Sequence, residues 1–154
     1  MTRLEVGAKA PSFSLANQDG ETITSRSLLG QRFVLYFYPA DDTPGCTVEA
    51  CGFNDELAGL GDLGVRVIGV SPDEATSHRA FRAKYALGFD LLSDPATTTM
   101  AAYGAYGEKT LYGKKVVGVI RSTFVVGPTG LVEHAWYGPR TKGHAQRVRA
   151  AIEG

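Results

Sequence analysis

The sequence is poor in cysteine, in excess charge and in long apolar runs, and each shortage excludes a class of protein. It has two cysteines in 154 residues, too few for a disulfide-rich secreted scaffold. Lys plus Arg and Asp plus Glu both number 16, so the overall charge favours neither nucleic acid nor an anionic membrane. No run approaches the roughly 18 apolar residues of a membrane span, and Met1 to Val6 lack the apolar core of a signal peptide. We therefore expect a cytoplasmic protein with no nucleic-acid or membrane partner.

The sequence also lacks internal repeats, low-complexity tracts and linkers, which predicts a single domain over residues 1–154. Strand-like and helix-like segments alternate along it. The expected strands are residues 13–15, 32–38, 65–71, 89–92, 122–126 and 131–136, and the expected helices are residues 44–60, 72–85, 96–103 and 142–152. A strand-helix-strand unit over residues 32–71 implies parallel neighbours, and a turn at residues 127–130 implies an antiparallel hairpin. The pattern predicts an α/β protein with a mixed central sheet and helices on its faces.

The two cysteines follow a segment with clear structural signals. A run of β-branched and aromatic residues, typical of a buried strand, stops at Pro39, which has no N–H donor. Thr43 suits a helix N-cap, and Pro44 suits the first helical position. Cys46 is therefore expected in the first helical turn, and Cys51 follows five residues later.

A helix start favours an anion at Cys46. The unpaired N–H groups and the positive end of the helix dipole stabilise negative charge, and a nearby Arg or Lys favours a thiolate further. In a capping box, the third residue after the capping Thr is often Glu, and here Cys46 occupies that place. We expect Cys46 to be partly thiolate at neutral pH.

The spacing of Cys46 and Cys51 indicates that a bond between them requires a change in structure. Five residues along an α-helix advance about 7.5 Å and rotate by roughly 140°, which separates the Cα atoms by about 8.6 Å. A disulfide needs about 4.4 to 6.8 Å. Two cysteines on one helix can therefore join only after its first turns unwind, and Gly45, Gly52 and Gly61 weaken that helix. The spacing suggests a redox switch that differs from a C-x-x-C motif.

Three structural roles for the cysteines compete with a redox switch. A free cysteine often acts as a small buried hydrophobe. A structural zinc site needs four ligands, but His78, His134 and His144 lie far from the cysteines in sequence, without ligand spacing. An inert structural disulfide conflicts with the helical geometry.

Arg121 interrupts an apolar, strand-like run between residues 117–120 and residues 122–126. An arginine is usually exposed. Within an apolar run, however, the charge would need a buried partner. A thiolate could be that partner.

The pattern Pro39-x-x-x-Thr43-x-x-Cys46 resembles the active-site signature of the peroxiredoxins, which are thiol peroxidases with a thioredoxin-like fold. Residues 37–51, with the second cysteine five residues after the first, resemble the Q-type branch, also called bacterioferritin comigratory proteins. Residues 69–73, 92–94, 112–115 and 121–125 also resemble that branch, so the resemblance covers roughly residues 4 to 152. It implies a thioredoxin-like fold with a mixed sheet and helices on both faces.

The resemblance also implies roles for individual residues. Cys46 would be the peroxidatic cysteine and Cys51 the resolving one, joined transiently in a Cys46–Cys51 disulfide. Thr43 would hydrogen-bond the peroxide and the sulfur, and Pro39 would shield the pocket and limit over-oxidation. Arg121 would hold the thiolate and the peroxide oxygen, since fixed donors aimed at developing charge lower a barrier.

Four further residues carry less information. Glu49 resembles a family position that supports the site, but by residue type alone it is most simply a helix-surface carboxylate. His78 is interpreted as a helix residue and not as a catalytic base. Tyr106 and Gly127 depart from the family pattern, which often has Trp and an acidic residue there, and neither is expected to touch the chemistry.

The implied cycle has three steps: peroxide oxidises Cys46 to a sulfenic acid, Cys51 condenses with it, and an external dithiol reduces the disulfide. The resemblance implies hydrogen peroxide and organic hydroperoxides as substrates and thioredoxin, or a similar dithiol, as reductant. The cycle needs no metal, haem or flavin. We expect a monomer or a weak dimer.

Two other function classes compete with a peroxidase. A thiol-disulfide oxidoreductase acting on protein disulfides would share the fold, but the absence of C-x-x-C disfavours it. A redox sensor would use disulfide formation to remodel the helix over residues 44–60 and change a partner surface. Recycling by a reductant distinguishes a peroxidase from such a sensor.

Overall fold

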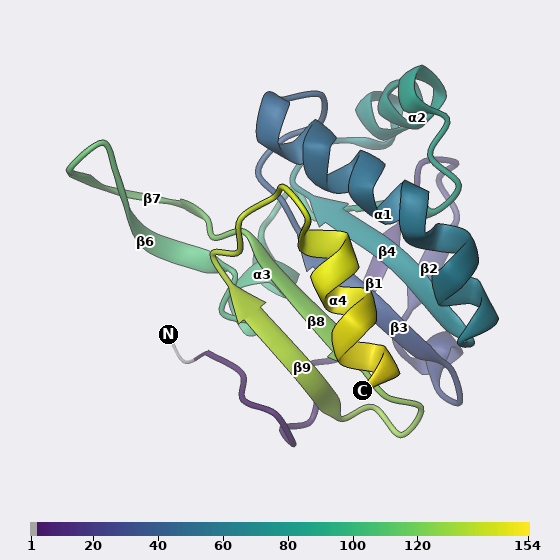
Figure 1. Ribbon diagram of the computed structural model, residues 1–154. Coiled ribbons are helices and arrows are strands. Elements are labelled where there is room, and N and C mark those ends of the chain that lie inside the picture. The colour runs from purple at the N-terminus through teal and green to yellow at the C-terminus, as the bar shows by residue number, and fades with distance from the viewer. Residues whose placement is uncertain (1–2) are drawn as a thin grey trace.

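In residues 3–154, the part of the chain that the computed structural model describes, a seven-stranded sheet forms the centre (Figure 1). Its strands are β1 (Ser14–Ala16), β2 (Thr22–Thr24), β3 (Arg32–Phe37), β4 (Val65–Ser71), β5 (Asp90–Ser93), β8 (Ser122–Val126) and β9 (Val132–Tyr137). The helices are α1 (Pro44–Asp62), α2 (Ala75–Tyr85), α3 (Thr98–Ala102) and α4 (His144–Glu153), with a short 3-10 helix, η1 (Arg26–Leu28). Strands β6 (Tyr106–Leu111) and β7 (Lys114–Val119) form a separate hairpin.

The sheet is mixed, as the sequence predicted. Its strand order is β2-β1-β5-β4-β3-β8-β9. The three central strands β3, β4 and β5 are parallel to one another, whereas β8 is antiparallel to both β3 and β9. The crossover from β3 to β4 is α1, which is the strand-helix-strand unit expected for residues 32–71.

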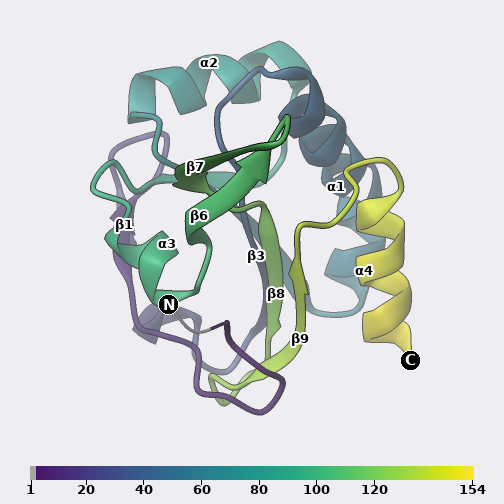
Figure 2. The same ribbon diagram turned by 90° about the vertical axis from the view of Figure 1, so that its left-hand side faces the viewer.

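The alternation of side chains along β3 divides the core into two layers. Val34 and Tyr36 face the layer that also contains residues of α1, α2 and α4. Phe33 and Leu35 face the opposite layer, which is closed by η1, by α3 and by the segment before β1. The view in Figure 2 shows α1 and α4 on one side of the sheet and α3 on the other. The prediction of helices on both faces is confirmed.

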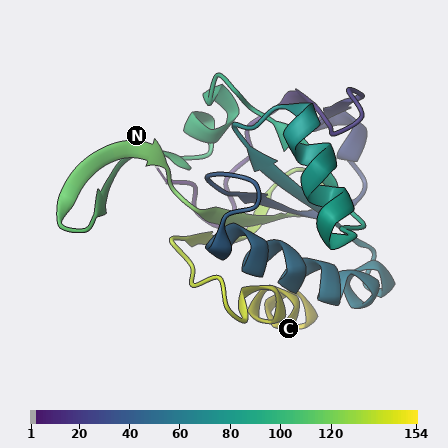
Figure 3. The same ribbon diagram turned by 90° about the horizontal axis from the view of Figure 1, so that it is seen from above.

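The C-terminal helix α4 lies beside α1 (Figure 3), and a buried histidine packs it against the rest of the protein. The Nε2 atom of His144 lies 2.8 Å from the Thr123 hydroxyl. Its ring packs edge-on against Phe53 of α1 and against Trp136 of β9, with 5.7 Å between ring centroids in both pairs. Burial lowers the pKa of His144 to about 4, so the ring is neutral at pH 7.

Helix α2 begins later than the sequence pattern indicated, at Ala75 instead of residue 72. The backbone N–H of Asp73 donates to the Ser71 hydroxyl at 3.1 Å, which closes a local turn after β4. Glu74 then has an extended backbone at the N-cap position. A side-chain hydrogen bond thus delays the helix, which the apolar periodicity could not reveal.

The β6–β7 hairpin was not predicted, and it extends away from the sheet (Figures 1 and 3). Its turn consists of Tyr112 and Gly113, both with positive φ, at 52° and 77°. A two-residue turn of this kind usually carries Asn-Gly or Asp-Gly, so Tyr-Gly gave only a weak signal.

No helix among the described residues is long and apolar enough to cross a bilayer.

Candidate active site at the start of helix α1

Cys46 lies where a parallel strand of the sheet gives way to a helix. Strand β3 ends at Phe37, an irregular loop follows, and α1 begins at Pro44 after Thr43 at the N-cap position. Cys46 is the third residue of the helix, with only 1% of its surface exposed. Sites in open α/β sheets commonly lie at this carboxyl end of the strands, and the helix N-terminus supplies a positive potential.

The structure brings Arg121 to the sulfur. Arg121 lies in the connection between β7 and β8, and its Nη2 atom donates to Cys46 Sγ at 3.3 Å. Its Nη1 atom donates to Glu49 Oε1 at 2.6 Å. Burial alone would lower the pKa of Arg121, but the charges on Glu49 and Cys46 outweigh burial and raise it. The guanidinium therefore remains charged between two acidic groups.

Glu49 is not on the helix surface, contrary to the expectation from its residue type. It is 1% exposed, and its Oε2 atom has no hydrogen-bond partner among the residues that the structure describes. Burial raises the pKa of Glu49 to about 7, although the Arg121 guanidinium opposes that shift. The wrong expectation followed from reading a carboxylate without knowing which helix face is covered.

Thr43 has the expected position but makes a different bond. Its backbone carbonyl accepts from the N–H of Thr47 at 2.8 Å, as an N-cap residue should. Its hydroxyl makes no capping bond and donates instead to the Ala40 carbonyl at 2.9 Å. The Thr43 hydroxyl thus closes the loop before α1. Pro39 is half-buried at the beginning of the same loop.

Cys51 lies on the same helix and is also a free thiol. It is partly exposed, unlike Cys46. Burial, and secondly the charge of Asp55 one turn along, raise the pKa of the Cys51 thiol. The premise that both cysteines share one helix is confirmed.

Two residues at this site were missed by sequence reasoning. The ring of Tyr36 stacks on Phe53 of α1 with 4.7 Å between centroids, and burial, followed by the charges on Glu49 and Cys46, raises the pKa of its phenol well above the usual value. A Cβ at Gly45 would come within 3.3 Å of Arg121 Nη2, so this glycine permits the close approach of the guanidinium. The only sequence signal for Gly45 was its place next to the cysteine.

Comparison with known proteins identifies the family of this chain. A family model described as the AhpC/TSA family matches residues 6–135. A peroxiredoxin of Mycobacterium tuberculosis is 47% identical over 148 residues, which cover 96% of this chain and 94% of that protein. This chain belongs to the AhpC/TSA family of peroxiredoxins. Peroxiredoxin Bcp of Escherichia coli is 40% identical to it over 144 residues, covering 94% of this chain and 92% of that protein.

Solved peroxiredoxin structures share its fold. A cysteine mutant of peroxiredoxin Q from Xylella fastidiosa superimposes with a TM-score of 0.92 at 33% identity, covering 99% of this chain and 98% of that one. The bacterioferritin comigratory protein of Xanthomonas campestris, studied for alkyl peroxide reduction, gives a TM-score of 0.87 at 40% identity, covering 92% of this chain and 90% of that one. The expected thioredoxin-like fold and Q-type resemblance are confirmed, and this peroxiredoxin is a thiol peroxidase.

Proposed function

We propose that Cys46 is the peroxidatic cysteine and that Cys51 resolves its sulfenic acid, so that one chain carries both thiols of the cycle. The observation that supports this most strongly is the 3.3 Å contact from Arg121 Nη2 to Cys46 Sγ. This contact lies at a helix start, where both the charge and the helix dipole favour a thiolate.

In the first step, the Cys46 thiolate attacks one peroxide oxygen and the O–O bond breaks. The second oxygen leaves as hydroxide or alkoxide and takes a proton to become water or an alcohol. The sulfur is oxidised to a sulfenic acid, and the peroxide is reduced by two electrons. Arg121 provides fixed N–H donors where this charge moves, and Glu49 holds the other arm of the guanidinium.

In the second step, the Cys51 sulfur attacks the Cys46 sulfur and water leaves, which forms the disulfide. The raised pKa of Cys51 keeps this thiol protonated while Cys46 reacts. Because both cysteines lie on α1, the first turns of that helix must unwind before the sulfurs meet.

In the third step, an external dithiol reduces the disulfide by exchange, and we assign this role to thioredoxin or a similar protein. Hydrogen peroxide and alkyl hydroperoxides are the proposed substrates, in keeping with the alkyl peroxide reduction studied in the Xanthomonas relative. A reducing cytoplasm suits a disulfide that forms only transiently. We assign the shielding of the pocket to Pro39 and the hydrogen bonding of the peroxide to Thr43.

Intact-mass measurement after less than one equivalent of hydrogen peroxide tests the two cysteine roles. The wild type should lose two hydrogens, Cys51→Ser should gain one oxygen, and Cys46→Ser should show no rapid change. With thioredoxin and its reductase, Cys51→Ser should react once and then stop, because its sulfenic acid has no partner. Sustained turnover by Cys51→Ser would exclude Cys51 as the resolving thiol, and a wild type that stays reduced would exclude the cycle.

A further inference from the structure

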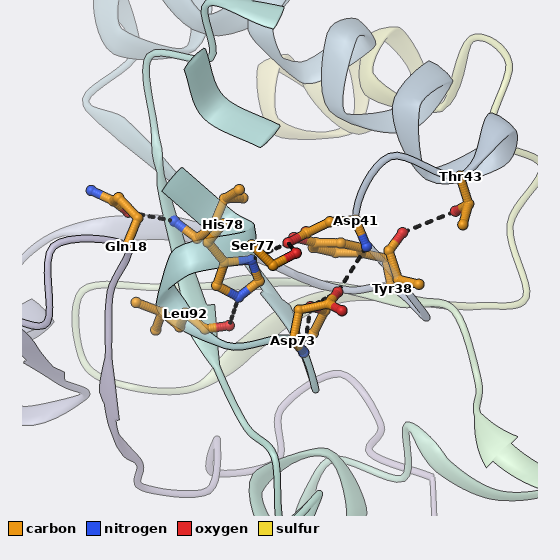
Figure 4. A network of polar contacts seen from close by, with 11 residues as sticks. Gln18, Tyr38, Asp41, Thr43, Asp73, Ser77, His78 and Leu92 are labelled. Atoms are coloured by element: carbon orange, nitrogen blue, oxygen red, sulfur yellow. Dashed lines mark hydrogen bonds and ion pairs between the residues drawn. The ribbon is translucent and has the colours of Figure 1, made fainter. Parts of the chain in front are cut away.

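The loop between β3 and α1 is bound by side chains from α2, which lies next to it (Figure 4). Asp41 of this loop has a side chain that is 4% exposed. Its Oδ1 accepts from the Tyr38 hydroxyl at 2.5 Å, and its Oδ2 accepts from the Ser77 hydroxyl at 2.7 Å. The same Oδ2 lies 2.7 Å from Nδ1 of His78, whose side chain is fully buried. Three donors thus converge on one buried carboxylate.

His78 makes one hydrogen bond through each of its ring nitrogens. Its Nε2 atom is 2.9 Å from the backbone carbonyl of Leu92, which can only accept, so Nε2 carries a hydrogen. Its Nδ1 atom faces Asp41, whose oxygens already accept from the hydroxyls of Tyr38 and Ser77. His78 thus links the backbone of β5 to the Asp41 carboxylate through its two ring nitrogens.

This cluster is a hydrogen-bond network and not an open ligand set. One ligating atom from each of Asp41, Asp73 and His78 lies within 4.8 Å of the others, a grouping that could also suit a cation. Asp73 Oδ2, however, already accepts from the backbone N–H of Asp41 and from the Ser71 hydroxyl, both at 2.7 Å. The acidic groups are therefore already occupied by donors of the protein itself.

The next loop residue, Asp42, is tied to the other end of α2. Its carboxylate accepts from Lys84 Nζ and from the Tyr85 hydroxyl, both at 2.7 Å. Its backbone has a φ of 56°, a left-handed conformation that is unfavourable for a residue with a side chain. Helix α2 therefore holds the loop at two adjacent positions, one of which is conformationally strained.

This loop leads directly into the first turn of α1. Thr43, the N-cap residue, follows Asp42, and Cys46 is three residues further on. Contacts that hold the loop in place stabilise the folded first turn, in which Cys46 meets Arg121. They must weaken when that turn unwinds, and an interaction made in only one of two states shifts the balance toward that state.

We propose that His78 and Asp41 are a positioning pair that holds Cys46 in its peroxide-reactive geometry and delays its condensation with Cys51. The pair touches neither sulfur and acts through the backbone of the loop. This inference rests on the proposed function, because it assumes two successive steps with opposite demands on the first turn of α1.

The test separates the two steps in a single turnover without reductant, by rapid quenching and intact-mass analysis after peroxide is added. Replacing His78 with Gln removes the imidazole ring and, with it, one of the two bonds. We expect His78→Gln to form the Cys46–Cys51 disulfide about tenfold faster from the sulfenic acid, since a hydrogen bond to a charged group is of this strength. Formation of the sulfenic acid should be equal to wild type or slower.

Ser77→Ala is a milder variant, in case loss of His78 prevents folding. It removes one donor to Asp41 and favours the helix, and it should accelerate the disulfide step by about threefold. Arg79→Gln is the matched control. Arg79 is also on α2, but it donates to the backbone carbonyl of Gln18, away from the loop. Its disulfide step should be unchanged.

The outcomes distinguish the inference from the function it rests on. If the wild type forms no disulfide between Cys46 and Cys51, the proposed function fails. If the wild type forms it, but folded Ser77→Ala and His78→Gln form it no faster, the positioning role is refuted.

Discussion

Cys46 and Cys51 lie five residues apart on the same helix, but the charges around them have opposite signs. Cys46 is buried at the helix start against the guanidinium of Arg121. Cys51 is partly exposed, and burial and the carboxylate of Asp55 raise the pKa of its thiol. The helix therefore gives the two thiols the same scaffold, and their neighbours determine the order in which they react.

The largest expected effect comes from removing the positive charge beside Cys46. Arg121→Met keeps an unbranched side chain but removes the donors to both Cys46 and Glu49. The rate of sulfenic acid formation should fall by about a hundredfold to a thousandfold, the range for loss of one preorganised donor. Stopped-flow measurement with hydrogen peroxide gives this rate. Arg121→Lys keeps a charge without the planar fork, so its rate of sulfenic acid formation should lie between those of the wild type and Arg121→Met. An Arg121→Met variant as fast as the wild type would contradict the role of Arg121.

Glu49→Gln tests the buried carboxyl group beside Arg121 through the pH dependence of stability. Burial raises the pKa of Glu49 from 4.5 to about 7. Between these values the unfolded chain loses the proton while the folded protein keeps it, so the free energy of unfolding falls as pH rises. At about 1.4 kcal/mol per unit of pKa, the loss is at most about 3.5 kcal/mol.

The Gln variant has no such proton to lose. Urea denaturation at about pH 5 and about pH 7.5 should show a smaller pH-dependent loss of stability in Glu49→Gln than in wild type. Because every other titrating group is common to both proteins, the difference between the two slopes reports Glu49. Equal slopes would mean that the carboxylate is already ionised throughout this range.

Gly45→Ala should have a smaller effect: it should lower the rate of the peroxide step and raise the free energy of unfolding. A Cβ at this position would come within 3.3 Å of Arg121 Nη2, so the guanidinium must shift away from Cys46 by a few tenths of an ångström. We expect the peroxide step to slow by up to about tenfold, while thermal unfolding shows a gain of about 0.5 to 1 kcal/mol from the better helix former. If activity and stability rise together, the close approach at Gly45 does not matter.

The smallest effect should come from Asp55→Asn, which removes the negative charge beside Cys51. The pKa of Cys51 should fall, because the Asp55 charge is the second cause, after burial, of its raised value. The disulfide step at neutral pH should then accelerate by roughly twofold to threefold, as expected for a partly exposed charge pair. Single-turnover mass analysis measures it. Asp62→Asn, at the far end of α1, is the matched control and should leave the rate unchanged.

The part of the site that was predictable from sequence is the part encoded locally. Pro44 and Thr43 placed the start of α1, and the position of Cys46 in its first turn followed from them. Arg121 could be singled out because a charge in an apolar run needs a partner, and the structure puts Cys46 and Glu49 beside it.

The parts that were not predictable depend on tertiary packing. The residue type of Glu49 alone predicted a helix-surface carboxylate, and only the family resemblance placed it at the site, because its burial depends on which face of α1 is covered. The contact between Asp41 and His78 joins residues 37 positions apart in the chain. No local pattern links them, and His78 therefore had no visible role beyond its helix.

The secondary structure likewise divides into elements that the sequence predicted and elements that it did not. Strands β4 and β8 have the predicted bounds, since each is a continuous run rich in β-branched side chains. Strand β2 is only three residues long, and the β6–β7 hairpin is largely half-buried or exposed. Short or solvated strands lack the apolar pattern on which such predictions depend.

The packing of α4 gives this peroxiredoxin an internal optical probe. Trp136 is the only tryptophan in the sequence, and the ring of His144 lies between it and Phe53. Phe53 is two residues beyond Cys51 on α1, so unwinding of the helix start changes the ring contacts that end at the indole. The emission of one native fluorophore should therefore follow each catalytic turnover in real time, without a label or a coupled enzyme.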